Sequence, residues 1–157
     1  MEFVARCSPR VATRPPWQAR TVSDAVTGYL HRAMPLCATL AIRGIRNDRE
    51  GVDLELDWAP ELCTSAGLLH GGAVMALADT AGGALAFANL PEGATGTSTI
   101  ESKTNFLRGV RAGTVRASAR VLHAGGTTIV VETEIRDDAG RLVAKTTQTQ
   151  AVLRPRA

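Results

Sequence analysis

Residues 68–88 read LLHGGAVMALADTAGGALAFA, and this stretch decides the fold. Its apolar residues return at steps of three and four positions, which is the period of a helix. They lie nearly all round the helix axis, so the helix predicted over residues 71–88 should be covered on most of its sides. One carboxylate, Asp79, stands in the middle of the helix. The apolar positions are Val74, Leu77, Ala78, Ala81, Leu85 and Ala88.

The run over residues 68–90 is also the one candidate in this sequence for a membrane-crossing segment. It contains His70, Asp79 and several glycines. A charged residue at the centre of a bilayer costs a few kcal/mol. We therefore expect a helix buried in a protein core, and no membrane partner.

Segments in which apolar residues recur at every second position precede and follow this helix in the sequence. Over residues 52–58 apolar residues alternate with three carboxylates, and NDREG at 47–51 predicts a hairpin turn before them. From Thr97 onward the chain predicts strands of ten to twelve residues, separated by turns at Gly125–Gly126 and at 136–141. Consecutive strands with short turns form an antiparallel sheet. The predicted fold class is α+β, a curved antiparallel sheet around a long central helix.

A shorter helix is predicted at SDAVTGYLHRAM, residues 23–34, with Ser23 as its N-cap and Pro35 ending it. Its apolar face holds Val26, Tyr29, Leu30 and Ala33.

A chain of 157 residues suits one domain with a real core. We expect a flexible basic tail over residues 1–20 and a single domain over residues 21–157.

Charge and cysteine content exclude several classes of function. The net charge of +3 is concentrated at the chain ends, and no basic block with interleaved aromatic residues is present. A nucleic-acid partner is therefore not expected. Cys7, Cys37 and Cys63 are odd in number and form no C-x-x-C pair, which predicts neither a disulfide framework nor a metal site. The reducing cytoplasm is the expected location.

Asp79 needs a physical reason in so apolar a setting. A buried carboxylate is costly unless it is paired, or faces a cavity or an interface where its charge is used. Its predicted stripe also contains Met75, Gly82, Gly83 and Ala86. Because glycine destabilises a helix interior by about 1 kcal/mol relative to alanine, the two glycines indicate close approach of a second backbone or of a ligand.

Gly71 and Gly72 open the helix, where the first backbone N–H groups have no internal acceptor and can hold an oxyanion. The simpler alternative is that they only let the chain turn into the helix. Asp79 follows Gly71 by eight residues, which is about 12 Å along a helix axis. One reacting carbonyl cannot touch both in one chain. If they act together, the carboxylate must come from a second copy in a dimer.

Two longer motifs carry a resemblance to a known family. They are LHGGAVMALADTAGGALA at 69–86 and TIESKTNFLRGVRAGTVRASARVLHAGGTTIVVETEIRDDAGRLVAKTT at 99–147. Residues 35–153 resemble the hotdog-fold thioesterases of the phenylacetic-acid-degradation and 4-hydroxybenzoyl-CoA type. The resemblance implies a hotdog fold and hydrolysis of an aryl or short- to medium-chain acyl-CoA. It also implies a homodimer that pairs again into a tetramer, without a metal or redox cofactor.

The same resemblance implies roles for residues of this chain. Gly71 would donate its N–H to the thioester oxygen, and Asp79 would act as nucleophile or as general base. His70 would hold the thioester or the loop, and Thr99 would orient water or the carboxylate. Both residues also have a simpler alternative. His70 could be a turn histidine without a chemical role, and Thr99 could be an ordinary strand residue.

Further roles are implied for binding, and here the chain departs from the family pattern. Thr64 stands where Asn or Gln is common, and its hydroxyl has a shorter reach. Gly126 stands where a basic residue is frequent, so contact with coenzyme A would fall to Arg108 or Arg111. Gly72, at the start of the helix, would also contact the substrate or its coenzyme. Both arginines could equally be solvated charges.

Three other functions remain alternatives. A hotdog dehydratase or hydratase needs a catalytic histidine placed with the acid, and His31 and His123 show no such motif. A Cys63–His70 nucleophilic pair has no orienting partner in the sequence. A non-catalytic acyl-CoA-binding or regulatory protein is favoured only by the substitution at Thr64.

Overall fold

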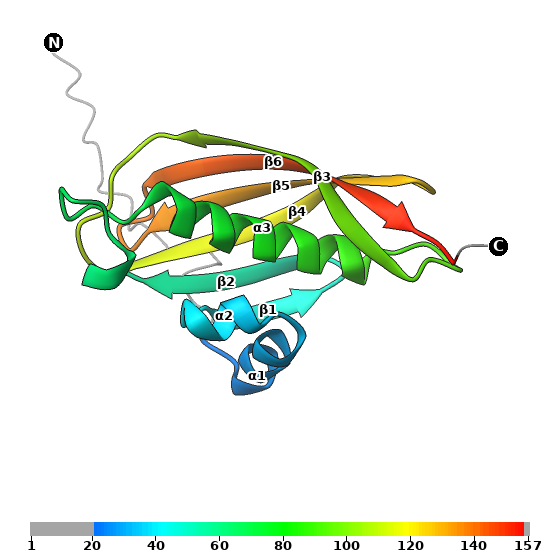
Figure 1. Cartoon of the computed structure of the whole chain (residues 1–157), viewed down its shortest axis with the longest axis horizontal. Coiled ribbons are helices and arrows are strands. Elements are labelled where there is room, and N and C mark those ends of the chain that lie inside the picture. Colours follow the sequence, from blue (N-terminus) through cyan, green and yellow to red (C-terminus); the bar gives the residue numbers. More distant parts are fainter. Residues whose placement is uncertain (1–20, 156–157) are drawn as a thin grey trace, which may run out of the picture.

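The computed structural model describes residues 21–155, and the basic tail expected over residues 1–20 lies outside them. Six strands form one antiparallel sheet in the order β1-β2-β4-β5-β6-β3 (Figure 1). The strands are β1 Arg43–Asp48, β2 Gly51–Asp57, β3 Gly96–Phe106, β4 Thr114–Ala124, β5 Thr128–Asp137 and β6 Leu142–Leu153. The helices are α1 Asp24–Ala33, α2 Pro35–Thr39 and α3 Gly71–Ala88, with a 3₁₀ turn η2 at Pro60–Leu62.

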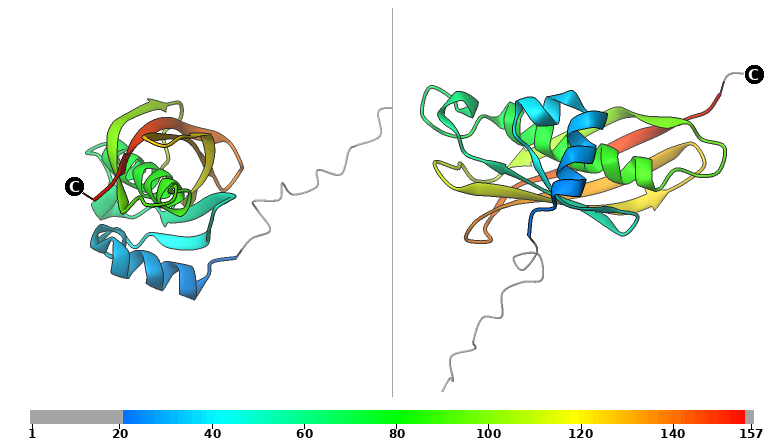
Figure 2. Two further views of the ribbon diagram at one scale, coloured as in Figure 1. Left: turned by 90° about the vertical axis from the view of Figure 1, so that its right-hand side faces the viewer. Right: turned by 90° about the horizontal axis from the view of Figure 1, so that it is seen from below.

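The sheet curves around α3, which lies along its concave face (Figure 2). Leu77, Ala81 and Leu85 are fully buried there against apolar residues of β2, β4 and β5. By length and hydropathy α3 could cross a membrane, yet 56% of it is buried in the fold. The helix predicted over 71–88 and the curved antiparallel sheet around it are both confirmed.

The short helix α1 packs against the edge strand β1, and α2 packs against α1. Ser23 caps α1 as predicted, since its hydroxyl accepts a hydrogen bond from Val26 N–H. The prediction for Pro35 was incomplete. It follows the end of α1 but also begins α2, because a proline at the first helical position loses no hydrogen bond. The His31 ring contacts the Ile42 carbonyl over 2.8 Å and fixes α1 against the sheet.

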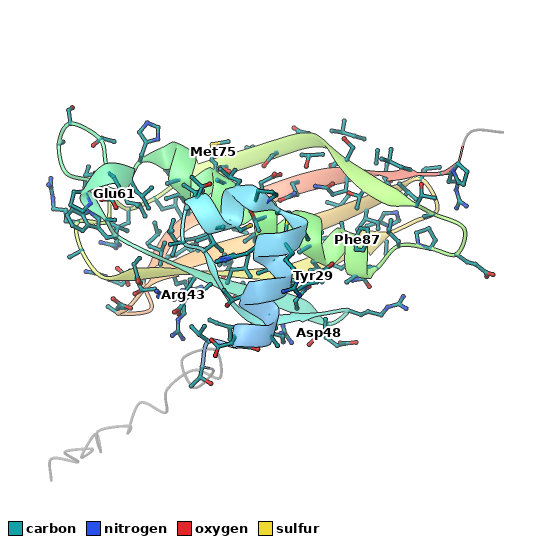
Figure 3. The ribbon with its side chains drawn as sticks, turned by 60° about the horizontal axis from the view of Figure 1, so that its bottom comes forward. Tyr29, Arg43, Asp48, Glu61, Met75 and Phe87 are labelled. Atoms are coloured by element: carbon teal, nitrogen blue, oxygen red, sulfur yellow. The ribbon has the colours of Figure 1, made fainter. Side chains whose placement is uncertain are left out.

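One face of α3 is left uncovered by the sheet. Asp79, Met75 and Phe87 are exposed on it, and Figure 3 places Met75 and Phe87 near opposite ends of the helix. The predicted stripe was therefore partly wrong, because Gly82 and Ala86 point into the core. Gly83 belongs to the open face, where an added Cβ would meet nothing within 4 Å.

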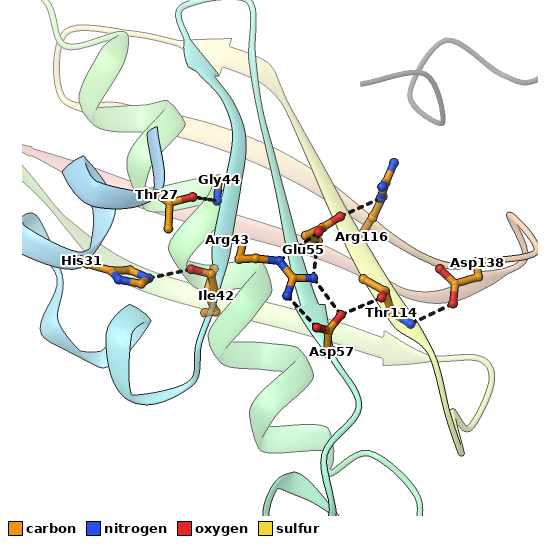
Figure 4. A network of polar contacts seen from close by, with 10 residues as sticks. All are labelled: Thr27, His31, Ile42, Arg43, Gly44, Glu55, Asp57, Thr114, Arg116 and Asp138. Carbon is orange, nitrogen blue, oxygen red and sulfur yellow. Dashed lines mark hydrogen bonds and ion pairs between the residues drawn. The ribbon is translucent and has the colours of Figure 1, made fainter. Parts of the chain in front are cut away.

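The convex face of the sheet carries a network of ion pairs (Figure 4). Arg43 Nη2 lies 2.8 Å from Glu55 Oε1 and Arg43 Nη1 2.6 Å from Asp57 Oδ2. The hydrogen bonds from Arg43 to Asp57 lower the pKa of the Asp57 carboxyl. The alternation over residues 52–58 is typical of a half-buried strand, but Asp53 and Glu55 are buried too, because arginine side chains from neighbouring strands lie over them.

Candidate active site

Asp79 is held by side chains from two strands. Thr99 Oγ1 of β3 donates to Asp79 Oδ1 over 3.1 Å, and Gln148 Nε2 of β6 donates to the same oxygen over 3.2 Å. Among the described residues none donates to Oδ2, and the Asp79 side chain is exposed. Hydrogen bonds to a carboxylate are stronger than neutral ones and fix its orientation. Asp79 is thus an oriented, accessible carboxylate.

Gly82 explains how Gln148 reaches the carboxylate. Gln148 is buried, and a Cβ on Gly82 would lie 2.2 Å from its Oε1. Among the described residues Gln148 Oε1 has no hydrogen-bond partner, so the amide is held by its packing on α3 and by the hydrogen bond from its Nε2 to Asp79. The close approach predicted for Gly82 exists, but the approaching group is a glutamine side chain and neither a backbone nor a ligand.

A second glutamine extends the network. Gln150 Nε2 donates to Thr99 Oγ1 over 2.7 Å, and Thr97 Oγ1 donates to Gln150 Oε1. Neither Gln148 nor Gln150 was predicted as a site residue from the sequence. A signal existed, because the alternation in β6 places both glutamines on the core side of the strand, where Ala144 also points. Two polar residues at core positions indicate a polar partner inside.

The start of α3 is held by His70. Its Nδ1 accepts a hydrogen bond from Gly72 N–H over 2.8 Å, and a Cβ on Gly72 would lie 2.9 Å from Nδ1. The Gly72 N–H is therefore already hydrogen-bonded within the chain. Within residues 21–155, Gly71 N–H donates to no acceptor, as expected at the first position of a helix. Gly71 also lies under the Phe106 ring, 3.1 Å from where a Cβ would be.

Thr64 belongs to the loop before α3. Its hydroxyl accepts a hydrogen bond from Ala66 N–H over 3.3 Å, and its backbone N–H donates to the Leu68 carbonyl. Leu69 N–H in turn donates to the Val110 carbonyl over 2.8 Å. These bonds tie the loop to the segment that follows β3. Thr64 therefore shapes the wall beside Gly71.

The two candidate arginines, Arg108 and Arg111, line different cavities. Arg108 lines the same cavity as Thr64 and Gly71. Arg111 donates from Nη1 to the Ala66 carbonyl over 2.9 Å and lines a different surface cavity with Asp138. Arg108 alone of the pair lies beside the helix start.

Five of the predicted site residues line two separate cavities in one chain, whereas His70, Gly72 and Arg111 line neither of them. Gly71, Thr64 and Arg108 line one of about 380 Å³. Asp79 and Thr99 line another of about 460 Å³, between α3, β3 and the two short helices. The lining residues of the two cavities do not overlap. A single chain therefore does not bring the Gly71 N–H and the Asp79 carboxylate to one reacting group.

Comparison with known proteins identifies the family. The model of the thioesterase superfamily matches residues 66–144, and a candidate esterase from Saccharolobus solfataricus is 31% identical over 83% of this chain and 91% of its own length. The chain belongs to the thioesterase superfamily. A thioesterase structure from Pseudomonas aeruginosa superposes with a TM-score of 0.75 and 29% identity, covering 81% of this chain and 93% of that one. The predicted hotdog fold and thioester hydrolase are both confirmed.

One relative has a more specific name. The 1,4-dihydroxy-2-naphthoyl-CoA hydrolase of Escherichia coli is 37% identical over 87 residues, which are 55% of this chain and 63% of that hydrolase.

The cysteines and histidines of the thioesterase form no further site within residues 21–155. Cys63 Sγ donates to the Ala59 carbonyl rather than to His70. Burial raises the pKa of the Cys37 thiol, which lines the Asp79 cavity as a neutral group. No group of three or more His, Cys, Asp or Glu side chains in this part of the chain could hold a metal ion.

Proposed function

We propose that this thioesterase hydrolyses acyl-CoA thioesters with an aryl or short- to medium-chain acyl group, at a site shared by two copies of the chain. The observation that carries the proposal is the exposed Asp79 carboxylate, which is fixed on Oδ1 by two donors and has no donor on Oδ2 among the described residues. The E. coli relative named for hydrolysis of an aryl-CoA supports the substrate class.

Gly71 N–H would polarise the thioester carbonyl. It stands at the positive end of α3 with no internal acceptor, so it can stabilise negative charge that develops on the carbonyl oxygen. Asp79 Oδ2 of the other copy would take a proton from an attacking water, or attack the carbonyl carbon itself. In either route the carbon–sulfur bond breaks, water supplies the new oxygen, and the products are the free acid and the coenzyme thiol.

The edge strand β3 supports the shared site. Among the described residues β3 pairs only with β6, and its other edge is open over eleven residues. Ile100 on this strand is 64% exposed, and Thr99 beside it holds Asp79. An open edge strand presents a row of unpaired N–H and C=O groups, which is a template for pairing with a second chain. Pairing of two β3 strands would bring the uncovered faces of two α3 helices together.

Arg108 would contact the coenzyme. It lines the cavity at the start of α3, next to the donor proposed for the thioester oxygen. A guanidinium forms paired hydrogen bonds with phosphate. Arg111 instead serves the loop, because its Nη1 is bonded to the Ala66 carbonyl.

The test is thiol release from a panel of acyl-CoA thioesters, with benzoyl-CoA, phenylacetyl-CoA and hexanoyl-CoA in it. The Asp79→Asn variant should lose at least about a hundredfold in kcat/KM, because it removes the base or nucleophile. Glu92→Gln, in an exposed loop, is the matched control and should keep wild-type activity. Tight acyl-CoA binding with no turnover of any thioester would contradict the proposal.

A further inference from the structure

The Asp79 cavity has a polar end and an apolar body. Asp79, Thr99 and Gln150 lie together at one end through their hydrogen bonds. The remaining wall is mainly apolar, from α1, α2 and the second half of α3. Its members include Ala33, Met34, Leu36, Gly83 and Phe87. A thioester at Asp79 would therefore direct its acyl group along α3, toward Phe87.

Gly83 leaves this body open. It follows Asp79 by four residues, so both lie on the same side of α3. An added Cβ at Gly83 would meet no atom within 4 Å, so no neighbour requires a glycine here. Since glycine weakens a helix, its position on the cavity wall points to space for a ligand.

A second cavity of about 480 Å³ continues from the first. It is lined by α1, β1 and the end of α3, with Val26, Asn47 and Ala88 among its walls. Tyr29, Ala84 and Phe87 line both cavities and therefore form the boundary between them. Figure 3 shows Tyr29 of α1 and Phe87 of α3 facing the same gap between the helices. Both rings are about half exposed, Tyr29 at 43% and Phe87 at 51%.

We infer that the acyl group lies between α1 and α3, that Gly83 provides its space, and that the Tyr29–Phe87 pair limits its length. This inference rests on the proposed function. Among the described residues Asp79 is the one charged side chain in the walls of the two cavities. A charged acyl tail would lose its hydration there without a partner. The substrate class is thus an uncharged acyl group that ends at Tyr29 and Phe87.

Two variants change the space in opposite directions. Gly83→Leu fills the cavity body, so the ratio of kcat/KM for hexanoyl-CoA over acetyl-CoA should fall at least about tenfold. Tyr29→Ala opens the boundary to the second cavity. The ratio for dodecanoyl-CoA over hexanoyl-CoA should then rise by a similar factor. Leu122→Ala, at an exposed leucine of β4 that lines neither cavity, should leave both ratios at the wild-type value.

Binding provides a readout that does not require turnover. Ketone analogues, in which a methylene replaces the thioester sulfur, can be titrated calorimetrically at the same chain lengths. If the wild type hydrolyses no thioester, the proposed function fails, yet the same shifts in Kd ratios would support the inference. Unchanged ratios in both variants, with folding verified by thermal unfolding, would overturn it even in an active thioesterase.

Discussion

Asp79 shows how a single residue becomes functional through its neighbours. The helix gives the carboxylate its place, while Thr99 and Gln148 from the sheet give it its orientation. Gly82 permits this arrangement by leaving room for Gln148. The carboxylate, two donors and one glycine therefore act as a unit built from three elements.

The adjacent glycines of α3 provide a matched pair of variants. Gly82→Ala places a Cβ 2.2 Å from Gln148 Oε1, which must move and release Asp79. We expect kcat to fall about tenfold or more, since loss of positioning costs transition-state stabilisation. Gly83→Ala meets no atom and should raise the free energy of unfolding by up to about 1 kcal/mol through helix propensity.

Both variants are measured with acetyl-CoA, so that the size of the acyl group does not enter, and by thermal unfolding. Equal activity and stability of the two alanine variants would show that Gln148 does not need Gly82. A loss of activity in Gly82→Ala without a loss of fold would support its positioning role.

At the scale of elements, the start of α3 depends on His70. Its Nδ1 accepts the Gly72 N–H, as an N-cap side chain does. His70→Ala should lower the free energy of unfolding by about 1 kcal/mol, whereas His70→Asn keeps a capping acceptor and should stay near wild type. Chemical denaturation gives both values. A His70→Asn variant with normal stability but no activity would contradict a purely capping role.

The sheet should weaken at acid pH. Glu132 lies between Lys145 and Arg120, and their hydrogen bonds, that of Lys145 first, lower the pKa of its carboxyl. Because the folded pKa lies below the unfolded one, this carboxyl stabilises the fold above its ordinary pKa of about 4.3, and that contribution is lost as the pH falls through the folded pKa.

Thermal unfolding from pH 7 down to pH 3 measures this effect. The midpoint should fall with pH, and Glu132→Gln should be less stable than wild type at pH 7 and closer to it at pH 3. Parallel curves for the two proteins would contradict the account. Asp57 and Asp137 have lowered pKa values too, so part of the wild-type slope should remain in the variant.

The spacing of apolar residues predicted the helices and strands well, because an element that is buried on one face has apolar residues at regular positions in its sequence. The α3 bounds and the later strands follow the predicted pattern. Asp53 and Glu55 escaped prediction because their cover comes from arginines on other strands. Gln148 and Gln150 escaped for a related reason. Which side chain meets Asp79 depends on how β6 and α3 are placed relative to each other, and no local pattern encodes that placement.

At the scale of the whole molecule, the candidate site is divided. The helix start with Gly71 and the carboxylate of Asp79 line separate cavities. The sequence predicted this division from the helical rise alone, while the open β3 edge and the uncovered face of α3 became visible only in the fold. In the proposed shared site, both features would lie at the contact with the second copy.

Heterodimers of two inactive variants test this shared site most directly. Gly71→Pro removes the N–H at a position where helices accept proline, and His70 already has the extended backbone that precedes one, with ψ of 137°. A Cβ at this position would meet the outer end of the exposed Phe106 ring. Asp79→Asn removes the carboxylate. Each variant alone should be inactive as a homodimer.

The two chains are co-expressed with different affinity tags, purified through both, and assayed for thiol release. A shared site predicts that each heterodimer contains one intact site of two and regains about half of the wild-type activity. Heterodimers as inactive as either parent would show that Gly71 and Asp79 of the same chain act together, and would contradict the account.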